Sequence, residues 1–301
     1  MKWLEVSICV GGELAEAVAE LFARYASEGV ALEWLPGDEH HPHEGIKVTV
    51  YVPVEGDVNA AKSKVEEGLW HLGQISPLPE AEYRLIEDGD WKQAWRDHYQ
   101  PIPVGESLLI IPAWMTVADA DRHPIILEPG MAFGTGTHPS TKLCLRAMET
   151  HIHRGDRVLD VGTGSGILSI AAVRLGAGRV WALDTDPDAI DVASENLDRN
   201  NVSAFIQLHV GDLSEVVRSN NITPVDMLVA NILAPVLISL LEEGMSDALR
   251  PEGTMILSGI LFDQVDPLLE LAEQSSLILK EIYSEDEWRA LVLRKSPLSI
   301  D

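Results

Sequence analysis

From residue 138 onward, short apolar runs alternate with stretches of helical periodicity. The apolar runs are RVLDV (157–161), RVWALD (179–184), AFIQLHV (204–210) and VDMLVAN (225–231), and helices are expected from about residues 165, 187 and 235. This alternation is typical of a parallel sheet covered by helices on both faces, because each connection between parallel strands must cross the sheet. The sequence therefore predicts a doubly wound α/β domain.

A glycine-rich turn, DVGTGSGI (160–167), follows the first of these strands and runs directly into a helix. Glycines allow the backbone to approach a ligand at the carboxyl edge of the sheet, where open α/β folds bind small molecules. A dinucleotide fingerprint has its third glycine five positions after the first, but that position is Ile167 here. The spacing favours S-adenosyl-L-methionine over NAD, with Gly162 and Gly164 as cofactor-binding residues.

Two acidic residues follow the next two strands. Asp184 ends the strand RVWALD, where its carboxylate can accept hydrogen bonds from both ribose hydroxyls of an adenosine, and Asp186 is better placed to cap the following helix. An acid at position 184 indicates a nucleoside but does not distinguish S-adenosylmethionine from NAD. Asp212 is either a partner of the adenine amino group or an ordinary loop acid.

The sequence VANILAP places Asn231 at the end of the fourth strand, before a helix that begins around Pro235. Methyltransferases that act on amino groups commonly carry Asn or Asp in this loop, where oxygen atoms accept hydrogen bonds from the target nitrogen and direct its lone pair at the methyl group. Asn231 is therefore the predicted catalytic residue and also a predicted cofactor contact. The alternative is an asparagine that only turns the chain at a strand end.

The first part of the chain has a different pattern. Residues 1–88 show the order βαββαβ, which predicts a small α+β ferredoxin-like domain. Residues 89–122 resemble a linker with a short helix and a strand, and residues 123–301 form the α/β domain. Tryptophans 91 and 95 are expected to pack between domains, and the histidines of GDEHHPHEG (37–45) match no standard zinc spacing.

Composition limits the partners and the compartment. The formal net charge is −26, which disfavours binding to nucleic acid and favours basic partners. No apolar run approaches the length of a membrane span, and the two cysteines are far apart, so a reducing cytoplasm is expected.

A second glycine-threonine run, EPGMAFGTGTHPST (128–141), makes the sequence more specific. Together with DVGTGSGI and ANILAP, this run closely resembles the methyltransferases that modify large-subunit ribosomal protein eleven. The resemblance extends to the segment DWKQAWRDHYQPIPVGESLLIIPAW and to the ending EDEWRALVLRK. It departs at Ser140, where threonine is common, and at Thr163, where cysteine is common.

The resemblance implies a seven-stranded class I methyltransferase domain in which Thr141, Gly162, Asp184 and Asn231 contact S-adenosylmethionine, with Gly164 in the same loop. It implies an N-terminal domain that holds the ribosomal protein and methylation of lysine side chains and an N-terminal amine. A monomer without a metal ion and without nucleic-acid contacts is expected.

The helix that begins at Pro139 should present free amide groups to the carboxylate of the cofactor, beside the Thr141 hydroxyl. His138 is a candidate general base, although its position before Pro139 suits the start of a helix equally well.

Three other functions remain open. The first is a methyltransferase for another basic protein, a glutamine or RNA, which mass spectrometry of methylated products would distinguish. The second is a non-catalytic ribosome assembly factor that forms no S-adenosylhomocysteine. The third is a nicotinamide-dependent dehydrogenase, against which the glycine spacing argues.

Overall fold

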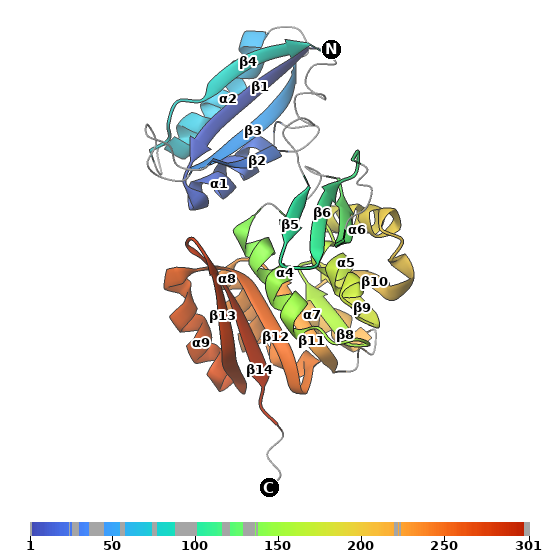
Figure 1. Ribbon diagram of the computed structural model, residues 1–301. Helices are drawn as coiled ribbons and strands as arrows, with labels where there is room; N and C mark the ends of the chain where they lie inside the picture. The colour runs from blue at the N-terminus through green and yellow to red at the C-terminus, as the bar shows by residue number, and fades with distance from the viewer. Residues whose placement is uncertain are drawn as a thin grey trace. The chain divides into compact units, whose positions relative to one another are not determined.

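The computed structural model divides into two compact units, which Figure 1 shows as ribbons. It describes residues 2–23, 25, 30–35, 45–54, 58–73, 77–87, 101–115, 121–128, 136, 138–219, 222 and 224–297. Within these, residues up to 87 belong to the first unit, and residues from 101 onward belong to the second.

The first unit has the predicted order βαββαβ. Its strands are β1 (Lys2–Val10), β2 (Val30–Leu35), β3 (Gly45–Val54) and β4 (Glu82–Glu87), and its helices are α1 (Gly12–Ala23) and α2 (Val58–Gly73). The strands form an antiparallel sheet in the order β2-β3-β1-β4. Alternate residues of β1 point to opposite faces, so Leu4, Val6 and Ile8 pack with helix residues such as Phe22 in one buried core.

The second unit contains the predicted seven-stranded sheet, in the order β10-β9-β8-β11-β12-β14-β13. The strands are β8 (Arg157–Val161), β9 (Arg179–Asp184), β10 (Ile206–Val210), β11 (Val225–Asn231), β12 (Leu249–Leu261), β13 (Leu277–Glu285) and β14 (Trp288–Lys295). The first five are parallel to one another, whereas β14 is antiparallel to both β12 and β13. The sequence pattern predicted a parallel sheet, and this antiparallel C-terminal hairpin is the departure from it.

Helices cover both faces of this sheet, as predicted (Figure 1). Side chains of α4 (Pro139–His151), α5 (Ile167–Arg174) and α6 (Pro187–Arg199) pack in one core. Those of α7 (Leu213–Ser219), α8 (Ala234–Glu242) and α9 (Val265–Gln274) pack in another. Three short 3-10 helices, η1 (Ser203–Phe205), η2 (Met245–Ala248) and η3 (Phe262–Gln264), complete the described unit.

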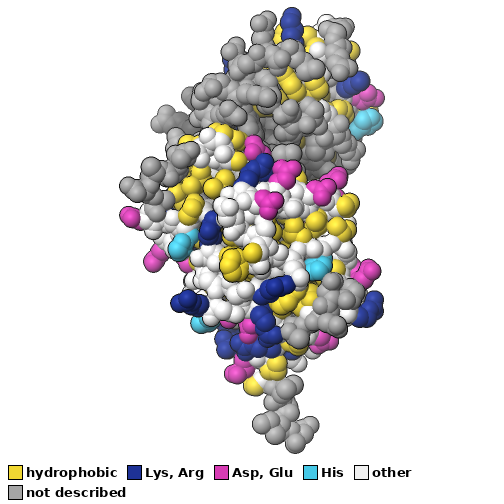
Figure 2. Space-filling view, turned by 90° about the vertical axis from the view of Figure 1, so that its right-hand side faces the viewer, with side chains coloured by type: hydrophobic (Ala, Val, Ile, Leu, Met, Phe, Trp, Pro, Cys, Tyr) yellow, Lys and Arg dark blue, Asp and Glu magenta, His cyan; other side chains and the backbone are white. Residues whose placement is uncertain are grey.

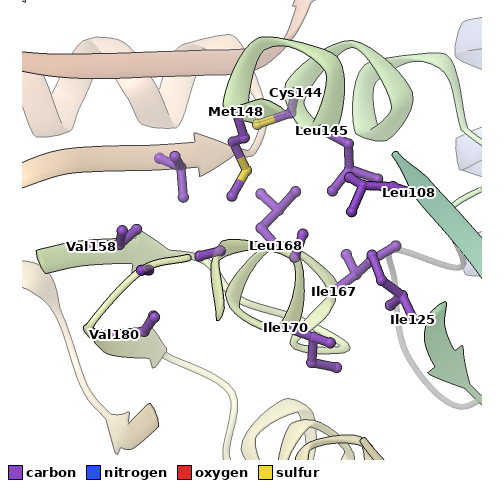
Figure 3. Close-up of a cluster of buried hydrophobic side chains, with 14 of the residues drawn as sticks. Leu108, Ile125, Cys144, Leu145, Met148, Val158, Ile167, Leu168, Ile170 and Val180 are labelled. Carbon is purple, nitrogen blue, oxygen red and sulfur yellow. The ribbon is translucent and has the colours of Figure 1, made fainter. Parts of the chain in front are cut away.

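Figure 3 shows the first of these cores. Met148 from α4 and Leu168 from α5 lie over the sheet that carries Val158 and Val180, Leu145 from α4 lies beside Leu108, and all six side chains are buried. Burial of a large aliphatic side chain contributes about 1.5–3 kcal/mol, so this layer fixes α4 and α5 firmly against the strands.

A small three-stranded sheet also belongs to the second unit. It consists of β5 (Ile102–Val104), β6 (Leu108–Pro112) and β7 (His123–Leu127), with β6 in the middle. Its side chains join the core beneath α4 and α5, so the second unit begins before position 123, the boundary expected from the sequence. The predicted short helix with Trp91 and Trp95, and the histidines of 37–45, lie outside the described residues.

Side chains of α4 and α6 fasten this small sheet. The Glu149 carboxylate accepts hydrogen bonds from the amides of Glu106 (2.9 Å) and Ser107 (2.5 Å) in the β5–β6 turn. The Asn200 carboxamide, at the end of α6, accepts from the amide of Ile126 (2.8 Å) and donates to its carbonyl (2.6 Å). The three strands are thereby fixed to the helices that flank the sheet.

The surface view in Figure 2 shows hydrophobic side chains in small groups between charged ones on the face presented. None of the helices in the described ranges is long and apolar enough to cross a membrane.

Candidate functional site

The predicted site residues come from three neighbouring strands and one helix. Gly162 and Gly164 follow β8, Asp184 ends β9, Asn231 ends β11, and Thr141 lies in the first turn of α4. Because β9, β8 and β11 are adjacent and parallel, their carboxyl ends lie along one edge of the sheet.

The glycine loop has a backbone that only glycine adopts easily. The φ angles of Gly162, Gly164 and Gly166 are +73°, +52° and +80°. A Cβ atom at position 162 would lie 2.4 Å from Cγ2 of Ile232, so the loop after β8 touches the loop after β11. The sequence needs glycine at 162 for close approach between two loops of the site as well as for its backbone angle.

Hydrogen bonds place Asp184 directly beside Gly164. The Gly164 amide donates to Oδ2 of Asp184 (2.9 Å), and the Asp186 amide donates to Oδ1 (3.1 Å). Each carboxylate oxygen has a second lone pair, so Asp184 is held in one orientation and can still accept a hydrogen bond from a ligand hydroxyl at each oxygen. Asp186 caps α6 by accepting from the amide of Asp188 (2.9 Å), which confirms that prediction.

Asn231 and Thr141 are also brought together. Nδ2 of Asn231 donates to Oγ1 of Thr141 (3.1 Å), across 90 residues of sequence. Oδ1 of Asn231 is buried and has no hydrogen-bond partner among the described residues. Since a buried acceptor without a partner is costly, this atom is suited to a donor supplied by a ligand. These donor and acceptor groups, with the open glycine backbone, fit an adenosine-containing cofactor and an amine.

His138 caps α4, which favours the structural reading over the catalytic one. Its Nδ1 accepts from the Ser140 amide (3.2 Å) and lies 2.6 Å from Oγ of Ser140, and its ring packs edge-on against Trp288 at 4.5 Å. Burial lowers the pKa of the imidazole to about 4, with a smaller effect from Lys142. A neutral imidazole already engaged at Nδ1 is a poor proton acceptor for an amine.

Asp212 caps the start of α7. Its Oδ1 accepts from the Ser214 hydroxyl and the Glu215 amide, both at 2.8 Å, and these bonds, led by the Glu215 amide, lower the pKa of the carboxyl. These hydrogen bonds favour the role of an ordinary loop acid for Asp212, and the adenine contact stays a prediction.

Asp160 lies beside the predicted site, and the sequence pattern assigned no role to it. It lies fully buried at the end of β8, where Oδ2 accepts from Thr163 and Ser169 (2.7 Å each) and Oδ1 has no partner among the described residues. Burial raises the pKa of this carboxyl to about 6, although the two hydroxyl donors oppose the shift. An acid between the valines of a predicted strand was the available signal, but its complete burial depends on tertiary packing.

Within the described residues, no group of three or more His, Cys, Asp and Glu side chains is arranged to hold a metal ion.

Known proteins resemble the chain along almost its whole length. Residues 2–296 match the family model described as ribosomal protein L11 methyltransferase. A ribosomal protein L11 methyltransferase from Chloroflexus aurantiacus is 36% identical over 324 residues, which covers 98% of each chain. A relative of the same name from Streptococcus thermophilus is 36% identical over 312 residues, covering 98% of this chain and 96% of that one.

A crystal structure of a ribosomal protein L11 methylase from Lactobacillus delbrueckii subsp. bulgaricus is similar as well. It has 32% sequence identity and a TM-score of 0.60, and the match covers 65% of this chain and 100% of that one. The match along the sequence and the agreement in fold lead to one conclusion: the chain belongs to the ribosomal protein L11 methyltransferase family.

Proposed function

We propose that this protein transfers methyl groups from S-adenosylmethionine to amino groups of ribosomal protein L11, on lysine side chains and at the N-terminus. The match of residues 2–296 to the family carries this proposal. The buried Oδ1 of Asn231 has no partner among the described residues and lies beside a glycine loop of the kind that binds nucleoside cofactors, and this chemistry also supports the proposal.

Each predicted residue has a role in holding the cofactor. The backbone of Gly162 and Gly164 admits it at the end of β8, and the Asp184 carboxylate accepts hydrogen bonds from its ribose hydroxyls.

The sequence predicted free amide groups at the amino end of α4, but the Ser140 amide donates to Nδ1 of His138 and the Lys142 amide donates to the His138 carbonyl. The positive end of the helix dipole still attracts the carboxylate of the methionine portion. The Thr141 hydroxyl accepts from Asn231 and can donate its own proton toward that carboxylate.

The target amine must be neutral before it can attack. At a reference pKa near 10.4, deprotonation of a lysine at pH 7 costs about 4.6 kcal/mol. When bound, S-adenosylmethionine supplies a methyl group on a sulfonium, whose positive charge disfavours the ammonium form of a nearby amine. Asn231 accepts an N–H of the neutral amine at Oδ1 and thereby directs the nitrogen lone pair toward the methyl group. This mechanism needs no dedicated base, because solvent can take the proton before the amine enters.

Incubation of the protein with labelled S-adenosylmethionine and a mixture of ribosomal proteins tests the function. We expect label in L11, and mass spectrometry should place methyl groups on amines. Label in RNA or in other basic proteins alone would contradict the choice of substrate, and the absence of S-adenosylhomocysteine would favour a non-catalytic assembly factor.

Asn231→Ala tests the mechanism, because it removes the acceptor while leaving the glycine loop in place. Loss of a positioning contact reduces rate by roughly 100-fold, so kcat should fall strongly at saturating cofactor. Unchanged methylation would show that Asn231 does not orient the amine.

The remaining expectations from the sequence form part of this proposal. The first unit, within the predicted range 1–88, binds the ribosomal protein, and the enzyme works in the cytoplasm as a monomer without binding nucleic acid. Sedimentation should give the mass of a single chain, and calorimetry with L11 should give binding that RNA does not compete with.

A further inference from the structure

Three large apolar side chains are exposed on the loops that follow β11 and β12. Leu233 and Val236 stand at the start of α8 and are 56% and 45% exposed, and Phe262, the first residue of η3, is 69% exposed. We call these three residues the apolar rim. A soluble protein leaves such side chains in water at a free-energy cost, and a group of them beside a site indicates a contact surface.

The two loops are neighbours at the edge of the sheet that carries Asn231. Asn231 pairs with Ser258 in the parallel ladder between β11 and β12. One residue later the backbones touch, because a Cβ atom at Gly259 would lie 2.4 Å from the carbonyl oxygen of Ile232. Leu233 therefore lies two residues beyond Asn231 on one loop, and Phe262 three residues beyond Gly259 on the adjoining one.

Phe262 is held in its exposed position. Its amide donates to the carbonyl of Glu287 (2.9 Å), and the amide of Leu261 donates to Oε1 of Gln264 (3.0 Å) at the start of η3. The guanidinium of Arg289 lies 5.1 Å from the ring centroid, while one of its nitrogens donates to the carbonyl of Asp286 (2.8 Å). The backbone that carries Phe262 is therefore fixed, and Arg289 contacts its ring, so the residue presents a preformed surface.

The charges around Phe262 favour a basic partner. Asp263, Asp266 and Asp286 are exposed beside it, and Arg289 is already engaged with the ring and with backbone carbonyls. An apolar surface edged with carboxylates complements a polypeptide that carries both apolar and basic side chains.

We propose that the apolar rim is where the segment of the substrate protein that bears the methyl-accepting amine docks, with Phe262 as its main contact. This rests on the proposed function, because the occupant is a basic polypeptide segment whose amine reaches Asn231. The apolar side chains next to the amine contact Leu233, Val236 and Phe262, and the basic ones face the three aspartates. The catalytic unit thereby recognises the residues around each target amine.

Steady-state kinetics of Phe262→Ala with intact L11 test the proposal. We expect KM for L11 to rise about tenfold, as for an aromatic contact at the centre of an interface, with kcat and the Kd for S-adenosylmethionine unchanged. Phe262→Leu should recover most of the affinity. Asp263→Asn should raise KM mainly at low salt, whereas the effect of Phe262→Ala should persist at high salt.

Phe205→Ala is a matched control. Phe205 is also an exposed phenylalanine in a 3-10 helix, 46% exposed, but it precedes β10 and so lies at the opposite edge of the sheet. The Phe205→Ala variant should therefore have an unchanged KM for L11. An unchanged KM in Phe262→Ala, or equal increases in both variants, would overturn the inference.

Two further results would also overturn it. A matching loss of S-adenosylmethionine affinity in Phe262→Ala would mean that the site itself was distorted, and a change in sedimentation would mean that the rim joins two copies of this chain. If the unaltered protein does not methylate L11, the proposed function fails and the assigned occupant fails with it. If the unaltered protein does methylate L11 and the Phe262→Ala variant has the same KM for L11, only this inference fails.

Discussion

Replacement of Gly162 by alanine should destabilise the second unit through two separable effects. The φ angle of +73° at this position costs an alanine about 1–2 kcal/mol, because its Cβ crowds the following carbonyl oxygen. The same Cβ would lie 2.4 Å from Cγ2 of Ile232, and overpacking of this kind costs about 1–3 kcal/mol. The expected loss in the free energy of unfolding is therefore about 2–5 kcal/mol.

Variants of Ile232 separate the two effects. Ile232→Ala removes Cγ2, so combining it with Gly162→Ala should relieve the steric part and leave only the backbone strain. The double variant should then be more stable than the sum of the single losses predicts, by about 1–3 kcal/mol. Ile232→Val is the matched control, because valine keeps Cγ2 and loses only the terminal methyl group. Its combination with Gly162→Ala should be additive.

Urea denaturation followed by circular dichroism measures these differences without cofactor or substrate. Additive losses, within about 0.5 kcal/mol, in both double variants would refute the contact between the loops after β8 and β11. If both double variants departed from additivity by the same amount, the overall size of the side chain at position 232 would matter, and not the position of its Cγ2 atom.

Variants at three further residues test other parts of the site. Thr141→Ala should weaken binding of S-adenosylmethionine in calorimetry while leaving adenosine affinity nearly unchanged, and equal losses for both ligands would contradict its assignment to the methionine end. The pKa of Asp160 is raised in the folded state to about 6 from about 3.9 unfolded, so the free energy of unfolding should fall by about 2 kcal/mol as pH rises from about 4 to about 6. Asp160→Asn should remove that decrease, and a persisting decrease would assign it to other groups. His138→Ala should cost about 1 kcal/mol through loss of the helix cap, His138→Asn should restore it, and a fall in activity with both variants at unchanged stability would revive the role of His138 as a base.

The local sequence pattern was sufficient to predict the helices, strands and turns that surround the site. The glycine spacing, the acid at the end of β9 and the cap at Asp186 each depend on a few consecutive residues, and the fold and the cap are found as expected. The contact between Asn231 and Thr141 was predicted only in part. The family resemblance suggested that both residues bind the cofactor, but it did not predict the hydrogen bond between them.

Features that depend on distant contacts were not predictable in this way. Strands β5, β6 and β7 have three to five residues each, and their place in the core depends on α4 and α5, which come later in the chain. The choice between cap and base at His138 likewise depends on Trp288, 150 residues away, whose ring helps to bury the imidazole. Burial sets the pKa values of His138 and Asp160, and sequence spacing carries little information about burial.

The carboxamide of Asn200 has a consequence for solubility. β7 is an outer strand of the three-stranded sheet, and the outer strand of a sheet exposes amide and carbonyl groups that can pair with another chain. Asn200 occupies both groups of Ile126, and Asn196, one turn earlier on α6, accepts from the next outward amide, that of Glu128 (3.4 Å). Two side chains of one helix thus stand in for a neighbouring strand, and this edge of the sheet is closed to aggregation through strand pairing.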